Sequence, residues 1–508
     1  MNSTPNTLSS RTLAEARLQS PPSRLIVEFY EKPHLEREIR QFDEYLQVDI
    51  AHTIMLAEQG ILGPTHARVI LEALEEIAAL GASHFPMDPA KGSFLLQVEA
   101  FLFDRVGESI GGRMHTGRSR LDQGPTVRRL YKRRHLVEVM NDLVALQESI
   151  LDLAARHDDT VMPGYTCLQH AHPTTFGHYL LSFCSKLADD FDRLRETYAR
   201  VNLSPLGAAG LAGTAWPINR ERTRELLGFD GLVVNSKLAR EAYYAAEMAG
   251  ALSFVMATLN DLATDLHVWS SHEFGFVQTA DEFCGTSSIF PQKKNPAGLE
   301  AVKFAAGGST TWLATALATF RAEGTGDVVM REVPILDSAF TATQGSLTLM
   351  AAIVATLTVN KARMEHVANE NWSTATNLAD QIVRESDLSF REAHSLVARL
   401  VRECVDQGIP VGGVNAELLR HAAVALDLPT PGLSTDAVRG CLEARAFVQT
   451  RTSAGGTAAS QIDELTQSAL ATVAAQRTWL KACEDKLAAA TAARAQAVAQ
   501  WLRQERPA

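Results

Sequence analysis

The residues best suited to chemistry lie in the stretch 281–300, DEFCGTSSIFPQKKNPAGLE. Lys293 and Asn295 are hydrogen-bond donors suited to a carboxylate or a phosphate, and Ser287 or Ser288 supplies a hydroxyl beside them. Prolines on both sides of the two lysines argue against a helix, and the glycine before the serines favours a mobile loop. The stretch therefore predicts a loop that closes on an anionic substrate, with an ordinary basic surface loop as the alternative.

Two other polar segments have residues of the same kind. The segment 112–123, GRMHTGRSRLDQ, is cationic and contains glycines just before a long helical pattern, which suits either anion binding at a helix entry or a solvated turn. The segment 163–181, PGYTCLQHAHPTTFGHYLL, is a polar crossing between two expected helices and holds three histidines. Structural histidines and a helix-capping threonine explain that crossing equally well.

The loop at 281–300 resembles the signature loop of the fumarase/aspartase superfamily, and most closely that of argininosuccinate lyase. The resemblance implies that Ser287 removes a proton from the carbon next to a carboxylate. It also implies that Lys293 and Asn295 hold that carboxylate as it takes up negative charge. Glu300, just after the loop, matches a carboxylate that partners a histidine of the family.

The other two polar segments resemble the family's first and second signatures. Arg120 matches an arginine that holds a substrate carboxylate, and Thr166 matches a substrate ligand. Further substrate contacts implied by the resemblance come from Ser119, Ser288, Gln169 and His172. Each signature lies at a helix end, far from the others in sequence. The resemblance therefore implies a homotetramer whose active sites are shared between subunits around a common helical bundle.

The sequence departs from the family at positions that bind argininosuccinate. Leu121 stands where the family has an asparagine, and Cys167 replaces a histidine that is a leading candidate for the general acid. Protonation of the leaving group is then open to Cys167, His170, His172, Thr166 or water. In the connection 323–337, an alignment anchored on Pro334 and Asp337 replaces a tyrosine, a glutamine and a lysine by Gly324, Val329 and Glu332.

Composition sets the class of the protein. The 508 residues are rich in Ala and Leu, only 7% are aromatic, and Val-Ile-Thr alternation is scarce, which predicts an all-α fold. The net charge of −11 is spread out, so no nucleic-acid partner is expected. The six cysteines form no Cys-x-x-Cys pair, so neither a metal site nor a disulfide framework is indicated, and the resemblance implies no cofactor. No signal-type segment and no apolar run of ~18 residues is present, so a cytoplasmic protein without membrane contact is expected.

Helical patterns and breakers predict an arm and three helical domains. The arm covers 1–24, the N-terminal domain 25–114, the central long-helix domain 115–365 and the C-terminal domain 366–508. A heptad pattern in the central domain predicts a helix packed in a long bundle, which the resemblance places at the core of the tetramer: Leu252, Val255, Leu259, Leu262 and Leu266. A further helix is expected from Glu300 to Phe320.

The combined prediction is a lyase that eliminates fumarate, or a related unsaturated acid, from an N-substituted aspartate-like substrate. Because the contacts to the arginine end are replaced, the amine released is expected to differ from arginine. An amino-dicarboxylate such as ethylenediamine-disuccinate is the kind of substrate expected. One alternative is a true argininosuccinate lyase of arginine synthesis. The other is a non-catalytic homotetramer like the lens crystallins related to this family, which the survival of the matching loop residues disfavours.

Overall fold

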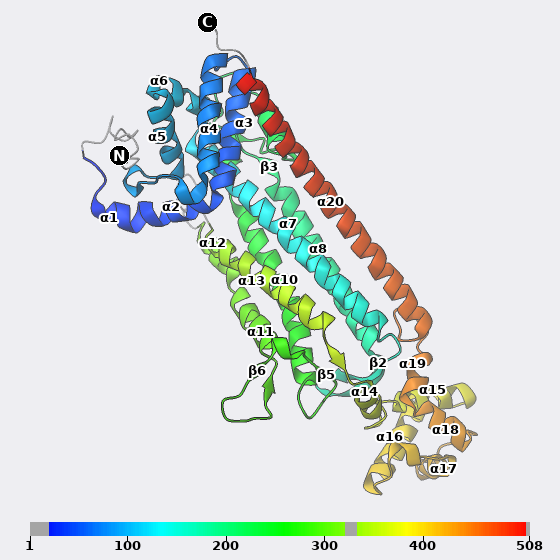
Figure 1. Cartoon of the computed structure of the whole chain (residues 1–508). Helices are drawn as coiled ribbons and strands as arrows, with labels where there is room; N and C mark the ends of the chain where they lie inside the picture. The colour runs from blue at the N-terminus through cyan, green and yellow to red at the C-terminus, as the bar shows by residue number, and fades with distance from the viewer. Residues whose placement is uncertain (1–19, 321–332, 504–508) are drawn as a thin grey trace.

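A computed structural model describes residues 20–320 and 333–503 of the chain (Figure 1). Helices form most of this part, and its strands are short and pair only in twos. The predicted all-α fold is confirmed. The three replaced positions of the connection, Gly324, Val329 and Glu332, lie outside the described residues, as does most of the expected arm.

The N-terminal helices form one cluster at the top of Figure 1. Aromatic rings hold this cluster together, since Phe94 lies 5.5 Å from both Phe42 and Phe85 between ring centroids. The helical segments are α1 (Arg24–Ile26), the π-helical turn η2 (Val27–Glu31), α2 (Lys32–Glu38), the 3₁₀ turn η3 (Ile39–Gln41), α3 (Phe42–Glu58), α4 (Pro64–His84), the 3₁₀ turn η4 (Pro89–Lys91), α5 (Phe94–Val106), α6 (Glu108–Gly111) and the 3₁₀ turn η5 (Gly112–His115).

A bundle of long helices forms the middle of the molecule. Its first helix is α7 (Arg120–Ala155), where Ser119 and Asp122 form a capping box. An apolar stripe along α7, which includes Leu136 and Leu143, packs into the core of the bundle. The other helical segments of this region are α8 (Phe176–Val201), α9 (Arg220–Leu226), the 3₁₀ turn η6 (Ser236–Arg240), α10 (Tyr243–Trp269), the 3₁₀ turn η7 (Asp281–Phe283), α11 (Ala297–Ser309), α12 (Trp312–Ala318) and α13 (Ile335–Ala355).

Two expectations for the bundle can be compared with the structure. The five heptad residues of α10 are all buried, which confirms a core helix. The helix expected from Glu300 to Phe320 was wrong in its extent. α11 starts earlier, at Ala297, and the helix is interrupted between the end of α11 and the start of α12. Two glycines near the end of α11, Gly307 and Gly308, weaken the helix before that break.

The C-terminal helices form a separate small cluster, and the last helix returns along the whole bundle (Figure 1). α20 packs against α7, α8 and α4, so it connects the two ends of the molecule. The helical segments are α14 (Lys361–Ala368), α15 (Ala375–Glu385), α16 (Phe390–Asp406), the 3₁₀ turn η9 (Val411–Gly413), α17 (Ala416–Ala425), α18 (Thr435–Cys441), α19 (Ala444–Gln449) and α20 (Ala459–Arg503). The domain boundaries drawn from the sequence stay a prediction.

The strands connect helix ends. The expected crossing at 163–181 contains an antiparallel hairpin of β1 (Val161–Thr166) and β2 (Gln169–Thr175). The remaining pairs are β3 (Leu203–Ser204) with β4 (Gly231–Leu232), β5 (Val277–Gln278) with β8 (Thr358–Val359), and β6 (Gly285–Thr286) with β7 (Lys294–Asn295). Among the described helices, only α13 is long and apolar enough to cross a membrane, and it packs on α7 with Phe340 and Leu347 buried.

Candidate active site

The loop with the candidate base is closed by the two-stranded ribbon of β6 and β7 and projects from the lower end of the bundle (Figure 1). At its foot, a Cβ added to Gly298 would lie 2.9 Å from Ile353 Cδ1, so a larger residue there would require the Ile353 side chain to shift. At its tip, Ile289 and Phe290 are 74% and 52% exposed. Two large apolar side chains so exposed indicate a loop that covers another surface.

The hydroxyl of Ser287 is held by its own loop. Its Oγ accepts hydrogen bonds from the backbone N–H of Ile289, at 3.3 Å, and of Phe290, at 3.0 Å. Two N–H donors directed at one oxygen interact more strongly with that oxygen when it is ionised. The local backbone thus favours the alkoxide of Ser287, which is the form that can remove a proton.

The polar neighbours of Ser287 differ in how they are engaged. Lys294 Nζ lies 2.5 Å from Asp281 Oδ1, and this contact lowers the pKa of the Asp281 carboxyl. Lys293 is exposed and makes no ion pair within the described part of the chain, so its ammonium is available to a ligand. Asn295 lies in β7 and Glu300 in the first turn of α11. Ser287, Ser288, Lys293 and Asn295 therefore lie on one loop, whose ends are joined by β6 and β7.

The second group of candidates forms the tip of the β1–β2 hairpin. Thr166 pairs with Gln169, and Cys167 and Leu168 form the two-residue turn between them with φ angles of 53° and 58°. Residues other than glycine pay on the order of 1–2 kcal/mol in this left-handed region. Thr166, Cys167 and Gln169 are all exposed, so the hairpin presents a hydroxyl, a thiol and an amide to solvent.

The two histidines of β2 are placed differently. His172 Nε2 lies 2.9 Å from Thr376 Oγ1, and its ring packs on Phe447 at 5.0 Å between centroids. Burial, followed by the charge of Arg451, lowers the pKa of His172. His170 packs edge-on to a tyrosine of β1, and its buried Nδ1 has no partner within the described part of the chain. His172 therefore fastens the hairpin to the C-terminal helices.

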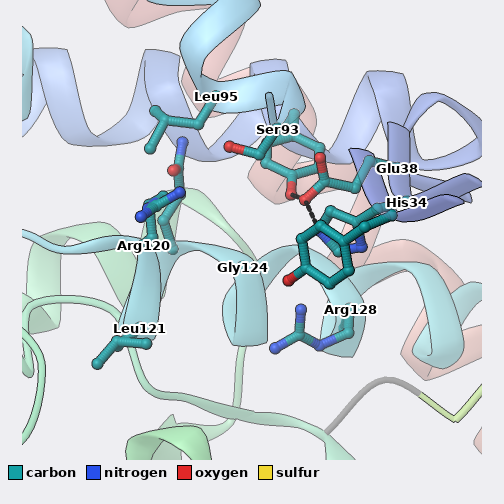
Figure 2. A pocket seen from close by; sticks show the side chains of 11 residues that line it. His34, Glu38, Ser93, Leu95, Arg120, Leu121, Gly124 and Arg128 are labelled. Carbon is teal, nitrogen blue, oxygen red and sulfur yellow. Dashed lines mark hydrogen bonds and ion pairs between the residues drawn. The ribbon is translucent and has the colours of Figure 1, made fainter. Parts of the chain in front are cut away.

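The third group lies at the start of α7. Ser119 caps this helix: its Oγ accepts from Leu121 N at 3.2 Å, and its N–H donates to Asp122 Oδ1 at 2.7 Å. Arg120, one residue on, lines a cavity of about 230 Å³ together with Leu121 (Figure 2). Leu121, which stands where the family has an asparagine, thus lines the same cavity as Arg120.

Most lining residues of this cavity were not predicted from the sequence, among them Tyr30, His34, Glu38 and Arg128. The first three repeat every four residues along η2 and α2, and Arg128 lies two helical turns after Arg120 on α7. That spacing was the available signal. It identifies polar faces of two helices but does not show that they face each other.

A buried ion pair supports the entry to α7 from behind. Arg118 Nη1 donates to Asp49 Oδ1 at 2.6 Å, and the side chains of both residues are fully buried. Gln123 Nε2 donates to the same oxygen at 2.6 Å. Burial raises the pKa of Asp49, and the Arg118 charge opposes that rise. These contacts join α3 to the segment that carries Ser119 and Arg120.

Replacing Asp49 by asparagine is expected to destabilise the protein by ~3–5 kcal/mol, because the Arg118 charge would be left buried without a counter-charge. Thermal unfolding of the variant measures the effect. The control is Asp406→Asn, which removes an exposed ion pair at 2.8 Å from Arg402. Exposed pairs contribute about 0–1 kcal/mol. Equal shifts for the two variants would show that the buried pair has no special role.

The three groups lie on distant parts of one chain. α7 has 36 residues and is therefore about 54 Å long. Residues 156–166, fully extended, could return at most about 37 Å of that length. Arg120 and Thr166 are then at least about 15 Å apart, and the start of α7 and the β1–β2 hairpin lie toward opposite ends of the bundle (Figure 1). A single chain does not bring Arg120 to the hairpin.

Comparison with known proteins identifies the family. A family model described as "Lyase" matches residues 17–308, and one described as "Argininosuccinate lyase C-terminal" matches 372–449. The argininosuccinate lyase of Methanocaldococcus jannaschii is 37% identical over 427 residues, covering 83% of this chain and 87% of its own length. The chain belongs to the argininosuccinate lyase family. It is accordingly an enzyme, a carbon–nitrogen lyase of the fumarase/aspartase superfamily.

Solved structures agree with this membership of the argininosuccinate lyase family. EDDS lyase in complex with formate has a TM-score of 0.86 and 34% identity, covering 95% of this chain and 97% of that one. A variant of EDDS lyase with bound fumarate also has a TM-score of 0.86 and 34% identity, covering 96% and 97%. The relatives named here are lyases, which favours an enzyme over the non-catalytic crystallin-like alternative. The roles of individual site residues stay predictions.

Proposed function

We propose that this lyase eliminates fumarate, or a related unsaturated acid, from an N-substituted aspartate-like substrate by C–N cleavage, with Ser287 as the base. The observation that carries the proposal is the pair of backbone N–H groups that hold Ser287 Oγ. A serine hydroxyl is too weak a base unless its alkoxide is stabilised. The bound fumarate of the EDDS lyase variant supports fumarate as the acid released.

Removal of the proton leaves a dianionic carboxylate that needs positive charge and donors. Lys293 and Asn295, on the same loop as Ser287, supply an ammonium and an amide for it. Groups fixed before the reaction stabilise charge that develops in the transition state, and each such donor is worth ~3–4 kcal/mol. Protonation of the leaving amine then falls to the exposed hairpin tip, where Thr166 and Cys167 lie.

The proposal includes a homotetramer with shared sites. Supporting it, a face of α10, α11 and α12 carries large exposed apolar side chains: Phe254 at 55%, Phe304 at 88%, Leu313 at 42% and Leu317 at 47%. A groove of about 440 Å³ lies on the same face and includes Phe254 and Leu313. Apolar surface of this kind on the central bundle suits packing against a second copy of the bundle.

The substrate is proposed to release an amine other than arginine. Leu121, which lines the cavity at Arg120, cannot donate a hydrogen bond. The exposed thiol of Cys167 stands where the family has a histidine. Each lost charge-assisted hydrogen bond weakens binding by about 1.5–3 kcal/mol. Similarity to EDDS lyase over nearly the whole chain favours an amino-dicarboxylate substrate, while the names of the sequence relatives favour argininosuccinate as the second candidate.

Purified enzyme is expected to show little or no arginine release from argininosuccinate, and to consume fumarate in the presence of another amine. Arginine release and the ultraviolet absorbance of fumarate are the two measurements. Turnover of argininosuccinate at ~1–100 per second, ordinary for an enzyme, would assign the protein to arginine synthesis. If the enzyme neither releases fumarate from argininosuccinate nor consumes fumarate in the presence of another amine, the proposed elimination itself is contradicted.

A further inference from the structure

Two arginines flank a glycine on one face of α7. Arg120, Gly124 and Arg128 follow at intervals of four residues, so they share one side of the helix. A Cβ added to Gly124 would lie 3.2 Å from Arg128 Nη1, so the guanidinium turns back along the helix over the glycine. Figure 2 shows Arg120 and Arg128 on this face, beside the cavity of about 230 Å³ that both line.

The acid that lines the cavity, Glu38, makes its contacts with residues other than these arginines. Its Oε1 accepts from Tyr45 Oη at 2.7 Å and lies 3.1 Å from His34 Nε2, while its Oε2 accepts from the backbone N–H of Phe94 at 2.6 Å. These three contacts all lie within the N-terminal cluster. Glu38 therefore serves the packing of α2 on α3 and α5.

The two guanidinium groups thus keep their charge for a ligand. Neither Arg120 nor Arg128 has a hydrogen bond or an ion pair with the described residues 20–320 and 333–503. Glu31 is an acid that interacts electrostatically with Arg120. Burial raises the pKa of Glu31, and the charges of His34 and Arg120 oppose that rise. A guanidinium binds a carboxylate through two parallel N–H donors. Two of them about two helical turns apart on one helix face suit a ligand with more than one carboxylate.

We infer that Arg128 is a specificity residue that binds a carboxylate on the amine half of the substrate. The inference rests on the proposed function, in which the succinyl half has two carboxylates. The loop takes one through Lys293 and Asn295, and Arg120 takes the other. Arg128 is then a surplus cation in the same cavity, and its ligand is a third carboxylate. The amine released is accordingly an aminocarboxylate.

The test compares amines in matched pairs during the addition of amine to fumarate by the full-length enzyme. Glycine is paired with methylamine, and 2,3-diaminopropionate with ethylenediamine. The wild type should prefer the carboxylated member of each pair. Arg128→Gln should raise the KM of that member ~10- to 100-fold, the equivalent of one lost charge-assisted contact. The KM of fumarate and the KM of the amine without a carboxylate should change little.

Two further variants distinguish a lost contact from a damaged fold. Arg128→Lys keeps the positive charge but loses the planar guanidinium that can donate two parallel hydrogen bonds, so it should give an intermediate KM. Arg402→Gln, on an exposed arginine of α16, should match the wild type for all four amines. An unchanged preference in Arg128→Gln, while fumarate addition continues, would overturn the inference and leave the proposed function intact. Failure of every amine to add would remove both.

Discussion

Replacing Ser287 by alanine is expected to reduce turnover at least a hundredfold and to leave the folded assembly unchanged. The reason is local: the two backbone N–H groups at 3.3 and 3.0 Å would have no oxygen to stabilise, and no base would remain at that position. General-base catalysis typically contributes 10²- to 10⁴-fold. Loss of fumarate in the presence of a reactive amine, followed by absorbance, measures the effect.

A matched control separates loss of the base from a general effect of removing a hydroxyl. Ser338→Ala removes an exposed hydroxyl on α13 that donates only to the carbonyl of Ile335, at 2.9 Å, and it should retain wild-type turnover. Size-exclusion chromatography should give the same assembly for both variants. Activity of the Ser287 variant within about tenfold of wild type would exclude this serine as the base.

The features that the sequence predicted are those specified by local pattern. Ser119 and Asp122 end a polar segment and cap α7, so the entry of that helix could be read directly. The prolines around the two lysines argue against a helix, and the chain is non-helical from 284 to 296, between η7 and α11. These signals act within a few residues, which is why one sequence was enough.

The hairpin at 161–175 was not predicted, because its turn lacks the usual signal. Two-residue turns of this kind favour Asn-Gly or Asp-Gly, since both positions need a positive φ angle. Here Cys167 and Leu168 occupy them. The bulge between Pro163 and Tyr165 also breaks the alternation of the strand. The conformation is imposed by contacts such as that of His172 with Thr376, from 204 residues away in sequence.

The cavity beside Arg120 was missed for a related reason. Tyr30, His34 and Glu38 are spaced as one helix face, and Arg128 continues the face of Arg120. Each face alone is an ordinary polar surface. Only the packing of the N-terminal cluster against the start of α7 turns them toward one cavity. Function assigned to these residues therefore depends on tertiary structure and could not follow from spacing.

Mixing two inactive variants is expected to restore activity if the active sites are shared between subunits. One variant carries Arg120→Met and the other Ser287→Ala. α7 is about 54 Å long and separates Arg120 from the lower end of the bundle, where the loop and the hairpin lie (Figure 1). A site that takes Arg120 from one subunit and Ser287 from another would be intact in about one quarter of cases after random exchange of equal amounts. Turnover should then approach about a quarter of the wild-type value, up from a background at least a hundredfold lower.

The control mixes Ser287→Ala with Lys293→Met. Both residues belong to the loop closed by β6 and β7, so one subunit supplies both to any given site. Every loop then carries one defect, and the mixture should remain inactive whatever the assembly. Subunit exchange is verified in both mixtures by native mass spectrometry of differently tagged chains. Exchange without recovery in the first mixture would place Arg120 and Ser287 in the same chain's site, or remove Arg120 from the site. Recovery in the second mixture would show that Ser287 and Lys293 of one active site come from different subunits.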